Sequence, residues 1–445
     1  MTPFTELGAL VESRWSDQNY AESVFPEIAA QSLSESNLCN LVDPWAIIRW
    51  VHSASTLPMQ MDLQAKFGNP PITLYVGPRF YIDIYYWLDG TTTIHQHAFS
   101  GAFQVLHGSS VHAGYRFEVE REINPHLLTG MLSFRDVSLL ARGDIREIHP
   151  GPKFIHSLFH LERPSVTITI RTYKAADFAR QYSYLKPSLA INPFFADVSL
   201  IRRVQTVSLI LRMKHPEADK FIGELVESSD FHTVYAVLRE AFDFLCHREL
   251  EEIVGVTRSR DRFEALLERA RRKHGELVDL LEPVFEEEWR QTEIIRRRAE
   301  VKNEDHRFMM ALILNVPERT RMLELVKERF SDGDAIDLIV GWVRELSATR
   351  TFGSKESNVL GSQEFNDGHL FVLRGLLQGL TVEEIKACAA SKVQPASASW
   401  PIEETINHLK ALPMFKGIFP PKLTGSLWEE REGRLSNFHC AYGPF

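Results

Sequence analysis

The sequence predicts an α+β protein of several domains, in which a small β-barrel follows short helices and precedes a mostly helical region. Three observations carry this prediction. Between Gly68 and about Tyr173, short runs of β-branched and aromatic residues alternate with turn residues, which is typical of a sandwich or barrel. Beyond Tyr173, apolar residues recur at helical spacing. With 445 residues, the chain also exceeds the size of a single hydrophobic core.

Residues 1–67 are expected to form a helical N-terminal segment. Leu7 and Val11 are spaced four apart, as on one face of a helix. Pro44 follows Asp43, and this order is typical of a helix start because Asp caps N-termini and proline tolerates the first turn. We expect these helices to pack on the domain that follows.

Residues 68–175 are expected to form the barrel. Turn residues such as Gly77-Pro78 and Asp89-Gly90 separate its strands. No helix of useful length fits inside this stretch, so a doubly wound α/β sheet is disfavoured. The predicted strands are residues 72–76, 80–87, 103–106, 111–119, 131–140 and 166–173.

Residues 176–410 are expected to form an α-helical domain, and residues 411–445 an irregular, proline-containing tail. Phe231, Val234 and Leu238 illustrate the helical spacing. Acidic and basic residues interleave between Arg258 and Arg307, which indicates solvated helices rather than an arm that binds nucleic acid.

The net charge and the cysteine spacing indicate which partners are not expected and which cellular compartment is. The net charge of -9 argues against a protein that neutralises phosphates, so no nucleic-acid partner is expected. No apolar run reaches the roughly 20 residues of a membrane helix, and the N-terminus lacks signal-peptide order, so we expect no membrane partner and a cytoplasmic protein. The cysteines form no CxxC pair and no disulfide framework, which fits a reduced compartment: Cys39, Cys246, Cys388 and Cys440.

A histidine pair follows the second predicted strand, in the order Ile94-His95-Gln96-His97. Side chains two residues apart on an extended segment point to the same side. Imidazole is the commonest metal ligand in proteins. His95 and His97 therefore supply half of a predicted metal site.

Three downstream histidines could complete this site: His149, His156 and His160. If residues 153–161 form a strand, His156 and His160 share a face but lie about 13 Å apart, so both cannot easily reach one ion. His149 precedes a proline, where strand geometry is undefined. The spacing alone leaves the third ligand open.

Several motifs in this region resemble the first signature of the cupin superfamily. They are the run Tyr85 to Gly90, the pair His95 and His97, and Val105-Leu106-His107-Gly108. The resemblance is closest to the cysteine dioxygenase (thiol dioxygenase) branch, because Gly101-Ala102 stands where most cupins have a glutamate ligand. It implies a three-histidine site in a double-stranded β-helix and covers about residues 72–175.

The run Ile168 to Tyr173 is similar to the strand that ends in an active-site tyrosine in the same branch. Counting back from Tyr173 favours His156 as the third ligand, with His149 and His160 as alternatives. The resemblance implies that Tyr173 and Arg171 are pocket residues. No arginine before the histidine pair matches the family's carboxylate-binding residue; Arg79 is the nearby candidate, and Arg171 could take that task.

The resemblance implies a mononuclear non-haem iron oxygenase that uses O2 on a small organic substrate, such as a thiol or an amino-acid derivative. Fe(II) is the expected metal, and Zn, Ni or Cu also suit imidazole ligands. The alternative is a non-catalytic cupin that senses a ligand and uses its helical domain to bind a partner. A homodimer is a further expectation.

Overall fold

The computed structural model describes residues 2–63, 68–88, 90–173, 180–247, 260–351, 358–362, 365–391 and 401–415. These residues form two compact units, which comprise residues 1–315 and 316–445 of the chain. The barrel and the histidine pair belong to the first unit.

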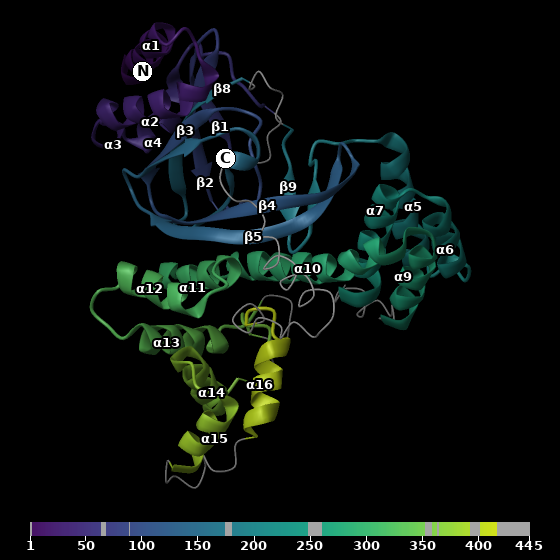
Figure 1. The fold of residues 1–445 in the computed structure, drawn as a ribbon. Helices are drawn as coiled ribbons and strands as arrows, with labels where there is room; N and C mark the ends of the chain where they lie inside the picture. The colour runs from purple at the N-terminus through teal and green to yellow at the C-terminus, as the bar shows by residue number, and fades with distance from the viewer. Residues whose placement is uncertain are drawn as a thin grey trace, which may run out of the picture. The chain divides into compact units, whose positions relative to one another are not determined.

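The first unit begins with four helices whose apolar faces cover one side of the barrel (Figure 1). The predicted helix start at Asp43 is confirmed, because its carboxylate accepts a hydrogen bond from the Trp45 amide at 3.0 Å. Phe4, Leu7 and Val11 lie in one core with Ile82 and Ile84 of the barrel. The helices are α1 (Thr2–Asp17), α2 (Phe25–Ser36), α3 (Leu38–Leu41) and α4 (Pro44–Ser53).

The first sheet of the barrel has the strand order β1-β2-β8-β3-β6, with antiparallel pairs throughout. Alternation along β2 sends Ile82 and Ile84 outward to the helices, and therefore sends Tyr81, Asp83 and Tyr85 to the opposite, inner face. The strands are β1 (Pro71–Val76), β2 (Phe80–Trp87), β3 (Gly101–His107), β6 (Ile145–Ile148) and β8 (Ser165–Thr172).

The second sheet has the order β7-β4-β5-β10-β9 and faces the first. Phe103 and Val105 from the first sheet form an apolar cluster with Leu140 and Leu158 from the second, so the inner faces enclose a core. The strands are β4 (Ser110–Asn124), β5 (Leu127–Leu140), β7 (Ile155–His160), β9 (Ser183–Leu185) and β10 (Leu189–Ile191).

The remaining elements of the first unit are helical and follow the barrel in the chain. Helices α5, α6, α7, α9 and α10 pack around one core, which includes Val207, Phe242 and Phe285 and extends to Leu127 and Leu189 of the second sheet. The elements are α5 (Val198–Arg212), α6 (Ala218–Ser228), α7 (Phe231–Phe242), α9 (Arg260–His274), α10 (Leu281–Arg298) and α11 (Glu304–Asn315), with a π-helical turn at Asp243–His247.

Hydrogen bonds between buried polar groups attach helices α10 and α11 to strand β7 and to the nearby residue Thr91. Arg298, which is fully buried, donates to the Thr91 hydroxyl at 2.6 Å and to the His160 carbonyl. The Ser157 hydroxyl donates to the side-chain carbonyl of Asn315 at 3.1 Å. Hydrogen bonds from a charged donor are the stronger kind, so α10 and α11 support this edge strand of the second sheet.

The second unit is helical in the part that the structure describes. Its helices are α12 (Arg319–Arg329), α13 (Ala335–Ala348), α14 (Asp367–Gln378), α15 (Val382–Ser391) and α16 (Ile402–Ala411). In the predicted tail, residues 416–445, which include Cys440, lie outside the described residues. Across the described helices of both units, none is long and apolar enough to cross a membrane.

The predicted fold class is confirmed: two antiparallel sheets with helices before them and a mostly helical chain after them. Helices α5–α11 share the first compact unit with the barrel. The domain boundaries predicted at 67/68, 175/176 and 410/411 stay predictions, because compactness does not by itself show which segments fold independently.

Candidate metal centre

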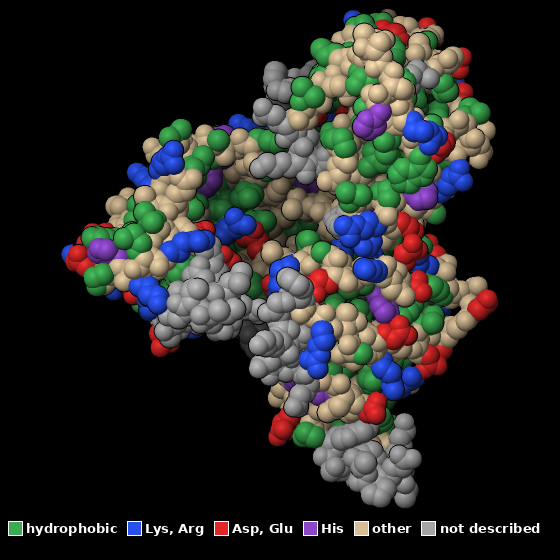
Figure 2. Space-filling model, turned by 180° about the vertical axis from the view of Figure 1, so that it is seen from behind, with side chains coloured by type: hydrophobic (Ala, Val, Ile, Leu, Met, Phe, Trp, Pro, Cys, Tyr) green, Lys and Arg blue, Asp and Glu red, His purple; other side chains and the backbone are tan. Residues whose placement is uncertain are grey.

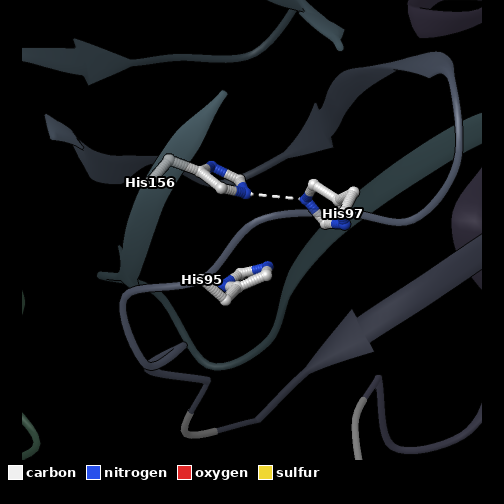
Figure 3. Close-up of side chains that lie close together, drawn as sticks. All are labelled: His95, His97 and His156. Atoms are coloured by element: carbon white, nitrogen blue, oxygen red, sulfur yellow. Dashed lines mark hydrogen bonds between the residues drawn. The ribbon is translucent and has the colours of Figure 1, made fainter. Parts of the chain in front are cut away.

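Two ligand candidates are set opposite each other by backbone pairing. The His95 amide donates to the His156 carbonyl and the His156 amide donates to the His95 carbonyl, both at 2.9 Å. Residues that exchange both hydrogen bonds in an antiparallel pair project their side chains to the same face. The two imidazoles therefore lie side by side, with ring centroids 4.7 Å apart (Figure 3).

The segment that carries the histidine pair also bonds to strand β9. The Tyr184 amide donates to the Ile94 carbonyl at 2.8 Å, and the Gln96 amide donates to the Tyr182 carbonyl at 3.1 Å. Since β7 and β9 are the two edge strands of the second sheet, residues 94–96 connect these edges. The histidine pair is thus held from both sides.

His97 completes a group of three. The Gly151 amide donates to the His97 carbonyl at 2.8 Å, which fixes the backbone beside the turn that precedes β7. One ring nitrogen from each of His95, His97 and His156 lies within 4.8 Å of the others. Nε2 of His97 and Nε2 of His156 are 2.9 Å apart, as the dashed line in Figure 3 marks.

The outer nitrogens of two rings have partners that orient the inner nitrogens. Nδ1 of His95 lies 2.7 Å from the Thr93 carbonyl, so this nitrogen carries the proton and Nε2 keeps its lone pair. Nδ1 of His156 lies 3.0 Å from Nε2 of His112. Two nitrogens bound to one ion at about 2.1 Å and a right angle would be about 3.0 Å apart, so the spacing of the His97 and His156 nitrogens, 2.9 Å, is that of two ligands of one transition-metal ion.

Burial keeps these imidazoles neutral, which is the form that binds metal. Desolvation lowers the pKa of His95, and it lowers the pKa values of His97 and His156 well below the ordinary value, with a further contribution from the neighbouring histidines. Desolvation also lowers the pKa of His112 to about 4. All four are therefore neutral at pH 7.

His112, which contacts the outer ring nitrogen of His156, was not predicted from the sequence. It lies on the inner face of β4, two residues from Gly114, the direct partner of His156. Ligating histidines usually use their second nitrogen in such a bond, which fixes the tautomer and the ring orientation. The only signal in the sequence is the even spacing of Ser110, His112 and Gly114, which becomes informative once the pairing with β7 is known.

The structure brings His156, and neither alternative, to the histidine pair. His149 is half-exposed and pairs with Glu147 at 3.0 Å. His160 is buried and stacks on Trp87 with ring centroids 4.7 Å apart. The three-histidine group of the described residues contains neither of them.

Arg171 lies beside the site, whereas the Tyr173 hydroxyl is engaged elsewhere. The guanidinium of Arg171 lies 3.7 Å from the centre of the Phe99 ring, and that ring packs on His97 at 4.6 Å. The Tyr173 hydroxyl donates to the Gly77 carbonyl at 2.7 Å. The roles assigned to these two residues stay predictions. Arg79 is exposed and lies over the Tyr20 ring, away from the inner face.

A buried carboxyl group also faces the barrel interior and was not predicted. Asp83 is fully buried on β2 and accepts a hydrogen bond from the Tyr85 hydroxyl at 3.1 Å. Desolvation raises the pKa of Asp83. The alternation of Tyr81, Asp83 and Tyr85 along β2 could have indicated this polar inner face.

Comparisons with known proteins give only distant similarity. The sequence matches no protein-family model and no curated protein. A cupin-2 domain protein from Rhodospirillum rubrum is 18% identical over 27% of this chain and 70% of its own, with a TM-score of 0.17. KdgF from Halomonas sp. is 16% identical over 27% of this chain and 98% of its own, with a TM-score of 0.17. Hydroquinone 1,2-dioxygenase from Sphingomonas sp. TTNP3 is 12% identical over 30% of this chain and 79% of its own, with a TM-score of 0.19. Scores this low carry no argument about this chain.

Replacing His112 should weaken metal binding without unfolding the barrel. His112→Phe keeps a ring in the apolar cluster but leaves Nδ1 of His156 without an acceptor, and losses of this kind cost about 10- to 100-fold in affinity. Competition with a chelator measures the effect. His107→Phe, at an exposed position on β3, is the matched control and should bind metal like the wild type; equal affinity of all three proteins would contradict the role of His112.

Replacing His160 should reduce the acid sensitivity of the fold. Burial lowers the pKa of His160 to about 3, so below the ordinary value of about 6.5 the unfolded chain takes up a proton that the folded chain does not. As the pH falls from 7.5 to 5, this side chain therefore lowers the free energy of unfolding by about 2 kcal/mol. His160→Phe should lose less stability over that interval in urea unfolding, whereas His149→Gln should behave like the wild type. Identical pH dependence of all three proteins would contradict the prediction.

Proposed function

We propose that the barrel binds one transition-metal ion through His95, His97 and His156, and that the protein is a cupin-type mononuclear non-haem iron oxygenase. One observation carries the proposal: three neutral imidazoles from two paired segments, one buried (His156) and two partly buried (His95 and His97), place their nitrogens within 4.8 Å of one another. Three nitrogen ligands leave open positions for a substrate atom and O2. The strand topology and the motifs around the histidine pair support the cupin assignment.

Fe(II) is the proposed metal, and Zn, Ni and Cu are compatible with the same ligands. When bound, Fe(II) would supply the electrons that activate O2 beside an ordered substrate. The ligand set contains no carboxylate among the described residues, which is the feature that the thiol dioxygenase resemblance implies. A small thiol or an amino-acid derivative is therefore the proposed substrate.

The surrounding residues would shield and orient the substrate. Phe99 and Phe154 pack against the His97 ring, with centroids 4.6 and 6.1 Å away, and keep water from that side. Arg171, held over Phe99, offers a positive charge next to the site and would attract an anionic group of the substrate. The Tyr173 hydroxyl would have to leave the Gly77 carbonyl to contact the substrate.

Metal analysis after anaerobic purification tests the site. The wild type should contain close to one metal ion per chain, and His95→Ala, His97→Ala and His156→Ala should each lose most of it, because two imidazoles hold an ion far less tightly than three. His149→Ala and His160→Phe are the matched controls and should retain it. Full metal content in all three triad variants would refute the metal site.

Oxygen consumption separates the oxygenase from the alternative, a non-catalytic cupin that senses a ligand and binds a partner through its helices. Iron-loaded protein should consume O2 when small thiols such as cysteine or its derivatives are added, and His97→Ala should abolish this. Arg171→Gln should raise KM for anionic substrates more than it lowers kcat. Saturable binding of these compounds to the iron-loaded protein without O2 consumption would favour the sensor.

A further inference from the structure

Helix α5 exposes large apolar side chains that no described part of the chain covers. Its opposite face, with Val207 and Leu211, is buried in the core shared with α7. The uncovered side chains are large, and most are more than half exposed: Phe194 72%, Val198 74%, Ile201 43%, Leu209 53% and Met213 64%. Their positions along the helix place Val198, Ile201, Leu209 and Met213 on one side. Exposed apolar groups gathered in this way usually mark an interaction surface.

The same helix is basic and contains no acidic residue. Arg202, Arg203 and Arg212 are exposed, and within the described chain none of them forms an ion pair. Arg202 donates to the Gln205 side chain at 2.7 Å and Arg212 to the Ser208 hydroxyl at 3.2 Å, and both acceptors are neutral. By angle along the helix, Arg202 and Arg212 lie between the exposed apolar residues.

The acidic residues next to this helix are already engaged. Asp197 caps the helix and accepts a hydrogen bond from the Leu200 amide at 2.7 Å. Glu217, beyond the C-terminal end, pairs with Lys220 at 3.1 Å. In a chain whose net charge is -9, the exposed face of α5 therefore stands out as a basic and apolar surface. On the helical part of the first unit, Figure 2 shows hydrophobic and basic side chains next to one another, with acidic side chains also present.

We propose that α5 is a docking surface for a membrane rich in anionic lipids. A helix that lies in the membrane interface buries one apolar side to a shallow depth, while arginines along it contact the lipid headgroups. The Arg202 and Arg212 stems are long enough to do this with the apolar residues inserted. Such contact needs no spanning helix, which is why the absence of a long apolar run in the sequence does not bear on it.

Charge argues against a second copy of this chain as the occupant. A two-fold dimer would place α5 against α5, and Arg202 and Arg212 of each copy would face the arginines of the other. Like charges across an interface destabilise it. The surface also presents single protruding side chains on a convex helix, which suits a deformable lipid layer better than a preformed protein groove.

Co-sedimentation of the full chain with lipid vesicles tests this proposal. The protein should bind vesicles of phosphatidylcholine mixed with phosphatidylserine, and should bind pure phosphatidylcholine much more weakly. Each lost arginine should lower the partition coefficient about fivefold, so the double variant Arg202→Gln with Arg212→Gln should bind about 25-fold more weakly. Ile201→Ser with Leu209→Ser should also lose binding, because it removes the inserted groups.

The controls are exposed residues elsewhere. Leu41→Ser replaces an apolar side chain of similar exposure, 64%, in the N-terminal helices, and Arg321→Gln removes an arginine that pairs with Glu324 at 3.0 Å; both should bind vesicles like the wild type. No binding to phosphatidylserine vesicles, or full binding by the α5 variants, would overturn the proposal. A dimer in solution that only the α5 variants break would also overturn it and would assign this surface to a second copy.

Discussion

The site depends on one reciprocal pair of backbone hydrogen bonds, between His95 and His156. These residues are far apart in sequence, and only their direct pairing places both imidazoles on the inner face at the same level. A shift of one residue in this register would turn one ring to the outside, since side chains alternate along a strand. The pairing is short, and it is supported because the Thr92 amide donates to the Leu158 carbonyl at 2.8 Å.

A buried charge reinforces the same pairing. Arg298, at the end of α10, bonds both to Thr91 on the segment that carries the histidine pair and to the carbonyl of His160 on β7. Burying an arginine costs free energy unless its hydrogen bonds are made. The burial of Arg298 is therefore favourable only when the two segments that accept its hydrogen bonds lie side by side. The helical region thus contributes to the geometry of the barrel from outside it.

Much of the fold could be predicted from the sequence, because local spacing determines which residues share a face. The helix start at Asp43, the strand that ends at Trp87 and the common orientation of His95 and His97 all follow from short-range rules. The choice of His156 over His160 does not, because it depends on which residue of β7 pairs with His95. His112 and Asp83 were missed for the same reason: their inward direction means little until their strands are paired.

Residues 94–96 join the two edges of the second sheet, and this has a consequence for when the metal site forms during folding. These residues bond to β7 on one side and to β9 on the other, so the segment that carries the histidine pair is held on both sides only after residues ninety positions apart, Ile94 and Tyr184, have come together. Long-range contacts of this kind form late in folding. The site is therefore assembled by completion of the barrel, and an ion that binds there would stabilise the finished fold rather than guide the early chain.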